Sequence, residues 1–373
     1  MPHTPQADRL NRIRLIFVRA WRQLLGCAFR TVLLLPDAAL LKLCGQPPRS
    51  IDGKRLDARA QFHAWFVQRF RAPLEVDAVE LRKPRLLSLG LLEDRPQPMA
   101  DLADRTLPGP GGPIPVRIYH PHTARPGAPI LVYFHFGGCV LGDLETCHTA
   151  CSLIAHHAGC IVVSVGYRLA PEHKYPAALD DAIAAYHWTI TNARLLGGDP
   201  ALVGVGGDSA GGYLAAALSL AMIRNRQAPP CLQLLIYPVI DMDRKNMPLT
   251  PFDEAYPLSR ADMIWFAEQY LNDPHEAEDP LCSVGRAKSL GGLPVTIIAL
   301  AGHDVLHDEG AAFARRLEAQ GVRVFFRSYD TLAHAFTAMS GGVPAARIAL
   351  IEIAQLIAEA FASLEHSKQG AAE

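Results

Sequence analysis

The sequence predicts an α/β fold in which a mostly parallel central sheet is flanked by helices. From about residue 100 onward, short apolar runs of strand length alternate with longer helical patterns, and this order is typical of a parallel sheet with crossover helices. The chain has 373 residues, of which 50% are hydrophobic and 20% charged, so it is long and apolar enough to bury a large core.

The expected strands are mostly continuous apolar runs, which indicate strands buried on both faces of a sheet. In chain order they are residues 114–121, 129–135, 160–167, 202–208, 231–239, 295–302 and 322–330. The first of them instead alternates apolar and polar residues, as a strand with one exposed face does.

The expected helices lie between these strands. They are residues 149–159, 176–193, 211–225, 308–321 and 343–364. Two further segments, 51–98 and 245–285, look helical but do not fit the alternation, so we expect them to cover one end of the sheet as the two parts of a cap. The main domain would then comprise 99–244 and 286–364, preceded by an N-terminal extension over 1–50 and followed by a polar tail over 365–373.

The N-terminal extension is basic and apolar. Six arginines, at positions 9, 12, 14, 19, 22 and 30, occur with no acidic residue between Asp8 and Asp37. They interrupt the apolar run that a secretory signal needs, and also the roughly 20 apolar residues that a membrane-spanning helix needs. Two interpretations remain: an amphipathic helix that makes peripheral contact with a membrane surface, or a helix that packs over the rest of the protein. We favour the second.

Charge and cysteine usage limit the partners and the compartment. Lys and Arg total 36 against 37 for Asp and Glu, which argues against nucleic acid as the main partner and favours a small molecule. The eight cysteines are scattered without a CxxC pair, which favours reduced thiols and a cytoplasmic location. Cys147, His148 and Cys151 could suggest zinc, but no second ligand cluster follows at a typical spacing, so no metal is predicted. The sequence leaves a homodimer open.

The most informative motif is G-x-S-x-G, formed by Gly207, Ser209 and Gly211 between an expected strand and an expected helix. A sharp strand-to-helix turn needs glycines beside the serine and projects its hydroxyl above the sheet edge. A dinucleotide-binding loop is the main alternative, but its third glycine position is occupied by Ser209. Ser209 is therefore the candidate nucleophile.

A serine nucleophile needs a base and an acid that orients the base, in the chain order Ser, acid, His for this architecture. Asp304 follows the strand at 295–302, and His334 follows the last strand. Because the carboxyl ends of parallel strands meet at one edge, we expect both side chains near Ser209. Asp241 and Asp243 also follow a strand, so they remain alternatives for the acid.

The strand at 129–135 ends in a glycine pair, Gly137 and Gly138. Attack on an ester carbonyl creates an oxyanion, which is stabilised by backbone N–H groups of the residue after the nucleophile and of a loop after an early strand. We expect Ala210, Gly137 and Gly138 to supply these donors, since glycine lets a substrate oxygen approach the main chain. Taken alone, the glycine pair would indicate a tight turn without a ligand.

Several motifs together resemble the hormone-sensitive lipase family of α/β-hydrolases, in its bacterial carboxylesterase branch. They are "HFGG" with "LGD", then "YRLAPEHKYPAALDDA", "GDSAGG", "AGHDVLHDEG" and "HAF", and the resemblance covers about residues 51–362. It implies an α/β-hydrolase fold with a helical cap, hydrolysis of small carboxylic esters without a cofactor, and the same oxyanion hole. Within the second motif, we expect Arg168, Glu172 and Asp180 to pair around the serine turn.

This chain departs from the family at the oxyanion loop, where the family usually has H-G-G-G followed by an aromatic residue. Phe136 takes the place of a glycine and Cys139 takes the place of the aromatic residue. We expect both, together with Asp208, to contact substrate, with the Phe136 ring at the acyl-binding mouth. The alternative for Phe136 is burial in the core.

These observations predict a serine carboxylesterase that hydrolyses small to medium esters through a Ser-Asp-His triad and an acyl-enzyme intermediate. The alternatives are a lipase, an amidase or a lactonase with the same triad, or a noncatalytic hydrolase fold that binds a ligand.

Overall fold

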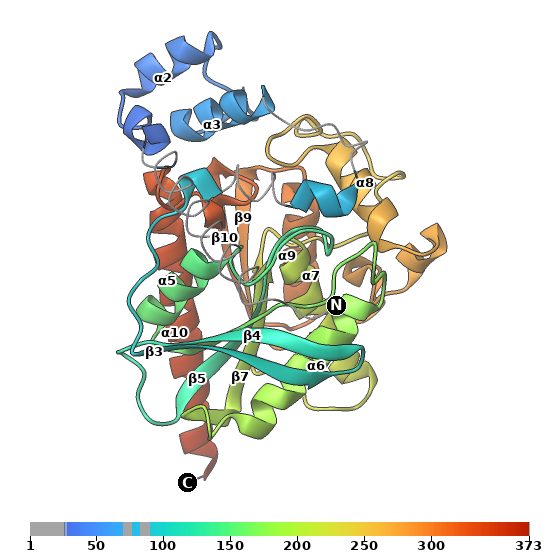
Figure 1. Cartoon of the computed structure of the whole chain (residues 1–373). Helices are drawn as coiled ribbons and strands as arrows, with labels where there is room; N and C mark the ends of the chain where they lie inside the picture. The colour runs from blue at the N-terminus through green and yellow to red at the C-terminus, as the bar shows by residue number, and fades with distance from the viewer. Residues whose placement is uncertain (1–25, 27, 70–76, 83–89, 373) are drawn as a thin grey trace, which may run out of the picture.

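The chain forms one eight-stranded sheet in the order β10-β9-β8-β7-β5-β6-β4-β3, in a computed structural model that describes residues 26, 28–69, 77–82 and 90–372 (Figure 1). The strands are β3 (Asp101–Gly109), β4 (Gly112–His120), β5 (Ala128–Phe134), β6 (Ile161–Val165), β7 (Gly198–Asp208), β8 (Leu232–Ile236), β9 (Val295–His303) and β10 (Val324–Ala333). From β6 to β10 all neighbours are parallel, whereas β3 and β4 are antiparallel. The predicted mostly parallel sheet is confirmed.

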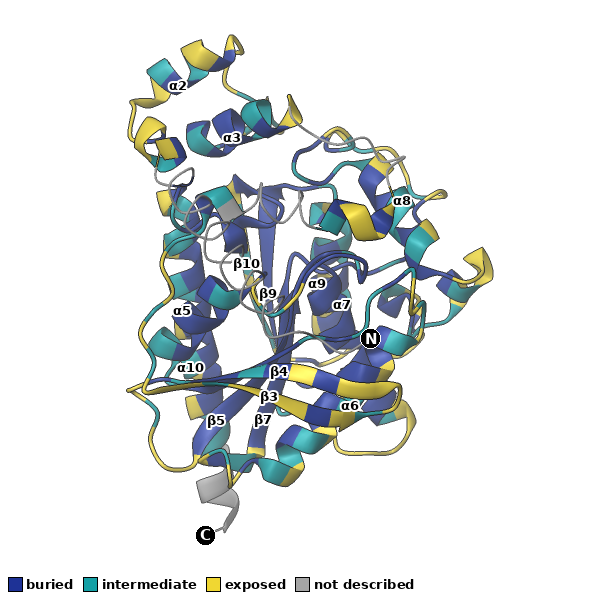
Figure 2. Ribbon diagram, in the orientation of Figure 1, coloured by how far each residue is buried: buried dark blue, intermediate teal, exposed yellow. Residues whose placement is uncertain are grey.

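The sequence did not predict strand β3. β3 pairs along its whole length with β4 at the edge of the sheet, and most of its residues are exposed or half-buried (Figure 2). A strand that faces solvent carries no apolar run, so its sequence resembles that of a loop.

Helices cover both faces of the sheet. α5 (His148–Ala158) and α10 (Pro344–Ala372) pack together on one face, and α6 (Ala177–Asn192), α7 (Ala210–Arg224) and α9 (His307–Ala319) cover the other (Figure 1). The buried side chains of β5 alternate between the two layers: Val132 and Phe134 join the α6 and α7 cluster, while Leu131 and Tyr133 join the α5 and α10 cluster. α10 continues to Ala372, so residues 365–372 extend that helix.

The two segments expected as a cap lie at one end of the sheet. The first contains the hairpin β1 (Ser50–Ile51) and β2 (Lys54–Arg55) and the helix α3 (Ala58–Gln68); the second contains α8 (Arg260–Tyr270) (Figure 1). They meet where the His63 ring lies edge-on to Tyr256, at 5.9 Å between centroids. α3 is tied to the strand end because the Asp57 N–H donates to the Thr331 carbonyl at 2.9 Å. Short 3-10 turns at Gly90–Leu92, Pro274–Glu278, Val284–Arg286 and Phe336–Ala338 complete the chain.

Part of the N-terminal extension packs against the protein. Phe29, Leu33 and Leu40, the last of them in α2 (Asp37–Cys44), are buried in the same cluster as Phe62 of α3. Residues 1–25, which hold most of the arginines, lie outside the described residues. Within the described part of the chain, no helix is both long enough and apolar enough to cross a membrane.

A buried ion pair joins the loop after β8 to α9. The Arg244 guanidinium donates to both oxygens of Glu309, at 2.6 and 2.9 Å, and the two side chains are only 3% and 10% exposed. Glu309 also accepts the backbone N–H of Ile240 at 2.8 Å. Removing one partner of such a pair leaves an uncompensated buried charge.

We therefore expect Glu309→Ala to lower the free energy of unfolding by about 3–5 kcal/mol, measured by urea denaturation. The matched control is Lys245→Ala, which removes an ion pair to Glu268 whose side chains are 65% and 52% exposed, and should cost less than about 1 kcal/mol. Equal losses in the two variants would contradict a stabilising role for the buried pair.

Candidate active site

Ser209 lies in a sharp turn between β7 and α7. Its backbone has φ 55° and ψ −116°, a conformation that residues other than glycine rarely adopt. The turn is held because the Ser209 N–H donates to the Ile236 carbonyl at 2.9 Å and its carbonyl accepts from the Val239 N–H at 3.3 Å. The serine hydroxyl thus sits at the carboxyl edge of the sheet, at the N-terminus of a helix, where negative charge is stabilised.

The glycines of the motif are required by packing. A methyl group added at Gly207 or Gly211 would overlap the carbonyl oxygen of Phe134, the last residue of β5. At Gly211 it would also come within 2.9 Å of the His135 carbonyl oxygen. The serine turn and the loop after β5 are therefore in direct main-chain contact.

The structure brings Ser209, His334 and Asp304 into one hydrogen-bonded series. His334 Nε2 lies 3.0 Å from Ser209 Oγ, and His334 Nδ1 lies 2.7 Å from Asp304 Oδ2. Because a carboxylate accepts, Nδ1 carries the proton, which leaves Nε2 free to accept from the serine. Asp304 Oδ1 accepts the Leu306 N–H at 2.9 Å, so both carboxylate oxygens are engaged.

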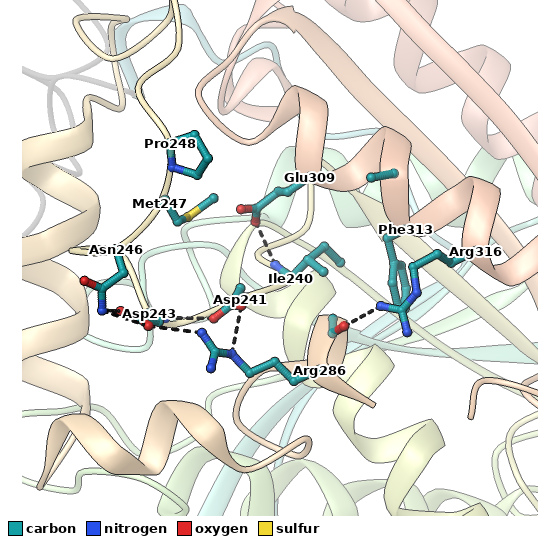
Figure 3. Close-up of a pocket in the computed structure, with 12 residues that line it drawn as sticks. Ile240, Asp241, Asp243, Asn246, Met247, Pro248, Arg286, Glu309, Phe313 and Arg316 are labelled. Carbon is teal, nitrogen blue, oxygen red and sulfur yellow. Dashed lines mark hydrogen bonds and ion pairs between the residues drawn. The ribbon is translucent and has the colours of Figure 1, made fainter. Parts of the chain in front are cut away.

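Asp241 and Asp243, the alternatives for the acid, both bind an arginine instead of His334. Arg286 donates to Asp241 at 2.9 Å and to Asp243 at 3.1 Å, and Figure 3 shows both carboxylates directed at this guanidinium, beside a cavity of about 330 Å³. Hydrogen bonds from Asn246, together with Arg286, hold the pKa of Asp243 below its usual range. Neither aspartate is a partner of His334.

The loop after β5 presents free backbone donors. Gly137 and Gly138 have φ values of 128° and 65°, and the turn closes on itself because the Val140 and Leu141 N–H groups donate to the Gly137 carbonyl at 3.0 and 2.8 Å. Among hydrogen bonds between described residues, none is donated by the N–H of Gly137, Gly138 or Ala210. These are the donors expected to face an oxyanion.

His135 and Tyr167 hold the base of this loop. The rings stack at 4.3 Å between centroids, the Tyr167 hydroxyl donates to the His135 carbonyl at 2.7 Å, and His135 Nδ1 donates to the Phe136 carbonyl at 2.8 Å. Burial lowers the pKa of His135, which keeps the ring neutral near pH 7. The sequence indicates no role for Tyr167 beyond its place in the motif at 167–182.

The three residues expected to contact substrate are all buried. Phe136 is 6% exposed and belongs to the cluster under α5 and α10, where burial of the aromatic surface is favourable, as in the alternative of a core position. Cys139 is fully buried in the cluster on the other face, and burial raises the pKa of its thiol, so it stays protonated. Asp208 is also fully buried, with its carboxylate held by protein groups.

Asp208 acts as a structural anchor behind the serine. Its Oδ2 accepts from the Tyr237 hydroxyl at 2.9 Å and from Thr337 Oγ1 at 2.6 Å. Burial raises the pKa of Asp208, and these hydrogen bonds act in the opposite direction by stabilising the carboxylate. Since the Tyr237 ring packs on His334 at 4.6 Å, this carboxylate connects the ends of β7, β8 and the histidine loop.

The expected pairing of Arg168, Glu172 and Asp180 is wrong. Arg168 instead binds Asp181, at 2.9 Å, because Asp181 is the acidic residue that faces the interior from α6. Glu172 pairs with Arg82, which precedes the sheet in the chain, at 2.7 Å.

The cysteine and histidine cluster at the start of α5 is engaged with protein groups. Cys147 Sγ donates to Asp208 Oδ1 at 3.5 Å, His148 Nδ1 pairs with the Tyr119 hydroxyl at 2.9 Å, and Cys151 is buried. In the described residues, no group of three or more His, Cys, Asp and Glu side chains could hold a metal ion.

Known proteins with a similar sequence or structure are α/β-hydrolases, and several carry ester-hydrolase names. A family model described as alpha/beta hydrolase fold matches residues 131–338. The carboxylic ester hydrolase LipN of Mycobacterium tuberculosis is 42% identical over 65% of this chain and 65% of its own length, so this match spans slightly less than two thirds of that relative. The esterase LipI of the same organism is 39% identical over 74% of this chain and 87% of its own. An ester hydrolase from the metagenome of Lake Arreo, solved with a bipyridine phosphonate derivative, superposes with a TM-score of 0.78 at 33% identity, over 82% of this chain and 99% of that one.

We expect Gly211→Ala to yield a poorly folded or inactive protein, because its methyl group would overlap the Phe134 carbonyl. The control is Gly291→Ala, where the nearest atom to an added methyl group is 3.8 Å away and the wild-type melting temperature should be kept. Thermal melting and hydrolysis of p-nitrophenyl acetate measure both effects; a wild-type-like Gly211→Ala enzyme would contradict the close contact.

Proposed function

Because the chain belongs to the hormone-sensitive-lipase-like family of α/β-hydrolases, we propose that it is a serine carboxylesterase whose triad is Ser209, Asp304 and His334. The observation that carries the proposal is the unbroken series of hydrogen bonds from Asp304 through His334 to the serine hydroxyl. The hydroxyl lies at a helix N-terminus, and the loop after β5, which contacts the serine turn, carries the free N–H groups of Gly137 and Gly138.

In the first half of the reaction, Ser209 attacks the ester carbonyl. His334 Nε2 takes the hydroxyl proton, and the carboxylate of Asp304 stabilises the imidazolium that forms. The tetrahedral oxyanion accepts from the N–H groups of Gly137, Gly138 and Ala210. The imidazolium then gives its proton to the leaving alkoxide, which departs as the alcohol and leaves an acyl-serine.

In the second half, water replaces the alcohol. His334 takes a proton from the water as it attacks the acyl carbonyl, the same donors hold the second oxyanion, and the proton returns to Ser209 Oγ as the carboxylic acid leaves. Every proton transfer and charge in this cycle is assigned to a residue of the chain, and no cofactor takes part in it.

An amidase or a lactonase would use the same catalytic groups. An amide differs from an ester in its leaving group, which is an amine, and a lactone differs in being a cyclic ester. The ester is favoured because two relatives and a structural neighbour carry ester-hydrolase names. The proposed substrates are small to medium esters. A lipase that acts at a membrane surface remains the alternative supported by the basic N-terminal extension.

We propose further that 51–98 and 245–285 form a cap over the main domain. Support comes from the contact between His63 and Tyr256, which joins these segments at the end of the sheet. Peripheral membrane contact through the N-terminal extension and a homodimer both remain predictions from the sequence.

We expect Ser209→Ala to lose kcat on p-nitrophenyl acetate by several orders of magnitude while the protein stays folded. Asp304→Asn should be far more damaging than Asp241→Asn, because only the partner of His334 Nδ1 fixes the tautomer. The reverse ranking of the two aspartates would reject the proposed triad, and an active Ser209→Ala variant would reject the mechanism.

Deletion of residues 1–25 should leave kcat on p-nitrophenyl acetate unchanged, because the proposed catalytic groups all lie beyond residue 130. Co-sedimentation of the full chain and the truncated chain with anionic liposomes tests membrane contact. Loss of liposome binding on truncation would support a surface anchor, and equal partitioning of the two forms would reject it.

A further inference from the structure

Cap helix α8 packs directly on the oxyanion loop. A methyl group built on Gly138 would lie 2.5 Å from Cγ and 2.8 Å from Cε1 of Phe266, so the aromatic ring lies against the Gly138 α-carbon. Gly138 is one of the loop residues whose N–H is free. The ring of Phe266 therefore borders the place where an oxyanion would be held.

A second residue of α8 supports the same contact. Tyr270 lies one helical turn after Phe266, on the same helix face, and its side chain contacts the thiol of Cys139. Tyr270 is 1% exposed and packs edge-on against Tyr213 at 6.2 Å between centroids. Two consecutive loop residues thus meet two residues of one helix face.

α8 is also tied to the main domain at its C-terminal end. The Tyr175 N–H donates to the Tyr270 carbonyl at 2.9 Å, and Lys174 Nζ donates to the Leu271 carbonyl at 2.7 Å. Asn272 Nδ2 donates in return to the Tyr175 carbonyl at 2.8 Å. These bonds satisfy carbonyls that a helix end leaves open, so the position of Phe266 is set by the scaffold.

We propose that Phe266 is a specificity-determining residue, which limits the bulk of the substrate at the carbon next to the ester carbonyl. The donors would hold the carbonyl oxygen, so the carbon next to the carbonyl, only two bonds from that oxygen, also lies close to the oxyanion loop. Phe266 is half-buried, which leaves part of its ring available to a ligand. Branching at that carbon therefore brings methyl groups toward the ring, whereas an acetyl group fits beside it.

This role rests on the proposed function. It is tested with p-nitrophenyl acetate, isobutyrate and pivalate, which share one leaving group and differ only in branching beside the carbonyl. Phe266→Ala should raise the ratio of kcat/KM for pivalate to that for acetate by about tenfold or more relative to wild type. Phe266→Leu should give an intermediate ratio, and melting temperatures show that both variants are folded.

The matched control is Ile264→Ala. Ile264 is also half-buried in α8 but lies two positions earlier and so points to a different side of the helix. It should leave the ratio within about twofold of wild type. The same gain in Ile264→Ala as in Phe266→Ala would overturn the role, because general loosening of the cap would then account for it.

A double-variant cycle tests the contact itself. Gly138→Ala should lose acetate hydrolysis because its methyl group would overlap the Phe266 ring and because alanine is strained at a φ of 65°. Adding Phe266→Ala should recover the part of the loss that the overlap causes. No recovery in the double variant would overturn the proposed contact.

Different results would overturn the proposed esterase function and the proposed role of Phe266. Absence of Ser209-dependent acetate hydrolysis in wild type would overturn the proposed function. An active, Ser209-dependent enzyme whose pivalate-to-acetate ratio does not change in folded Phe266→Ala would overturn only the role of Phe266.

Discussion

The carbonyl oxygen of Phe134 lies so close to Gly207 and Gly211 that neither position has room for a side chain. This contact aligns the end of β5 with the turn between β7 and α7. β5 and β7 are neighbouring parallel strands. Since Gly137 follows three residues after Phe134 and Ser209 lies between Gly207 and Gly211, one main-chain contact places both the nucleophile and the free N–H donors. The positive φ of Ser209 is tolerated because the bonds that the turn makes to the β8 side hold it there.

The buried carboxylate of Asp208 extends this arrangement to the base. A buried carboxylate is costly unless it is well hydrogen-bonded, and Asp208 accepts from Tyr237 and Thr337. Thr337 lies in the same loop as His334, and the Tyr237 ring packs on the imidazole. The histidine loop is thereby held to the two strands beside it, so the 3.0 Å approach of His334 to Ser209 depends on a group that does not touch the substrate.

Helix α8 is joined to the same region through the motif at 167–182. Tyr167 fixes the base of the glycine loop, Arg168 binds Asp181 of α6, and Lys174 and Tyr175 bind the end of α8. A single segment thus contacts both the loop after β5 and helix α8. The motif at 167–182 therefore has a structural role although it contains no proposed catalytic residue.

The sequence by itself determined the sheet, the serine turn and the candidates for the acid and the base, because strand periodicity and chain order are local properties and the carboxyl ends of parallel strands must meet at one edge. It left Asp241 and Asp243 as alternatives to Asp304 for the acid. Only the folded chain separates them, because Asp304 binds His334 whereas Arg286 binds the other two aspartates. It also placed Phe136 at the mouth of the site, whereas the structure buries this residue. The direction of a loop side chain and the choice of an ion-pair partner depend on which distant residues offer a cavity or a charge, and tertiary packing alone decides that.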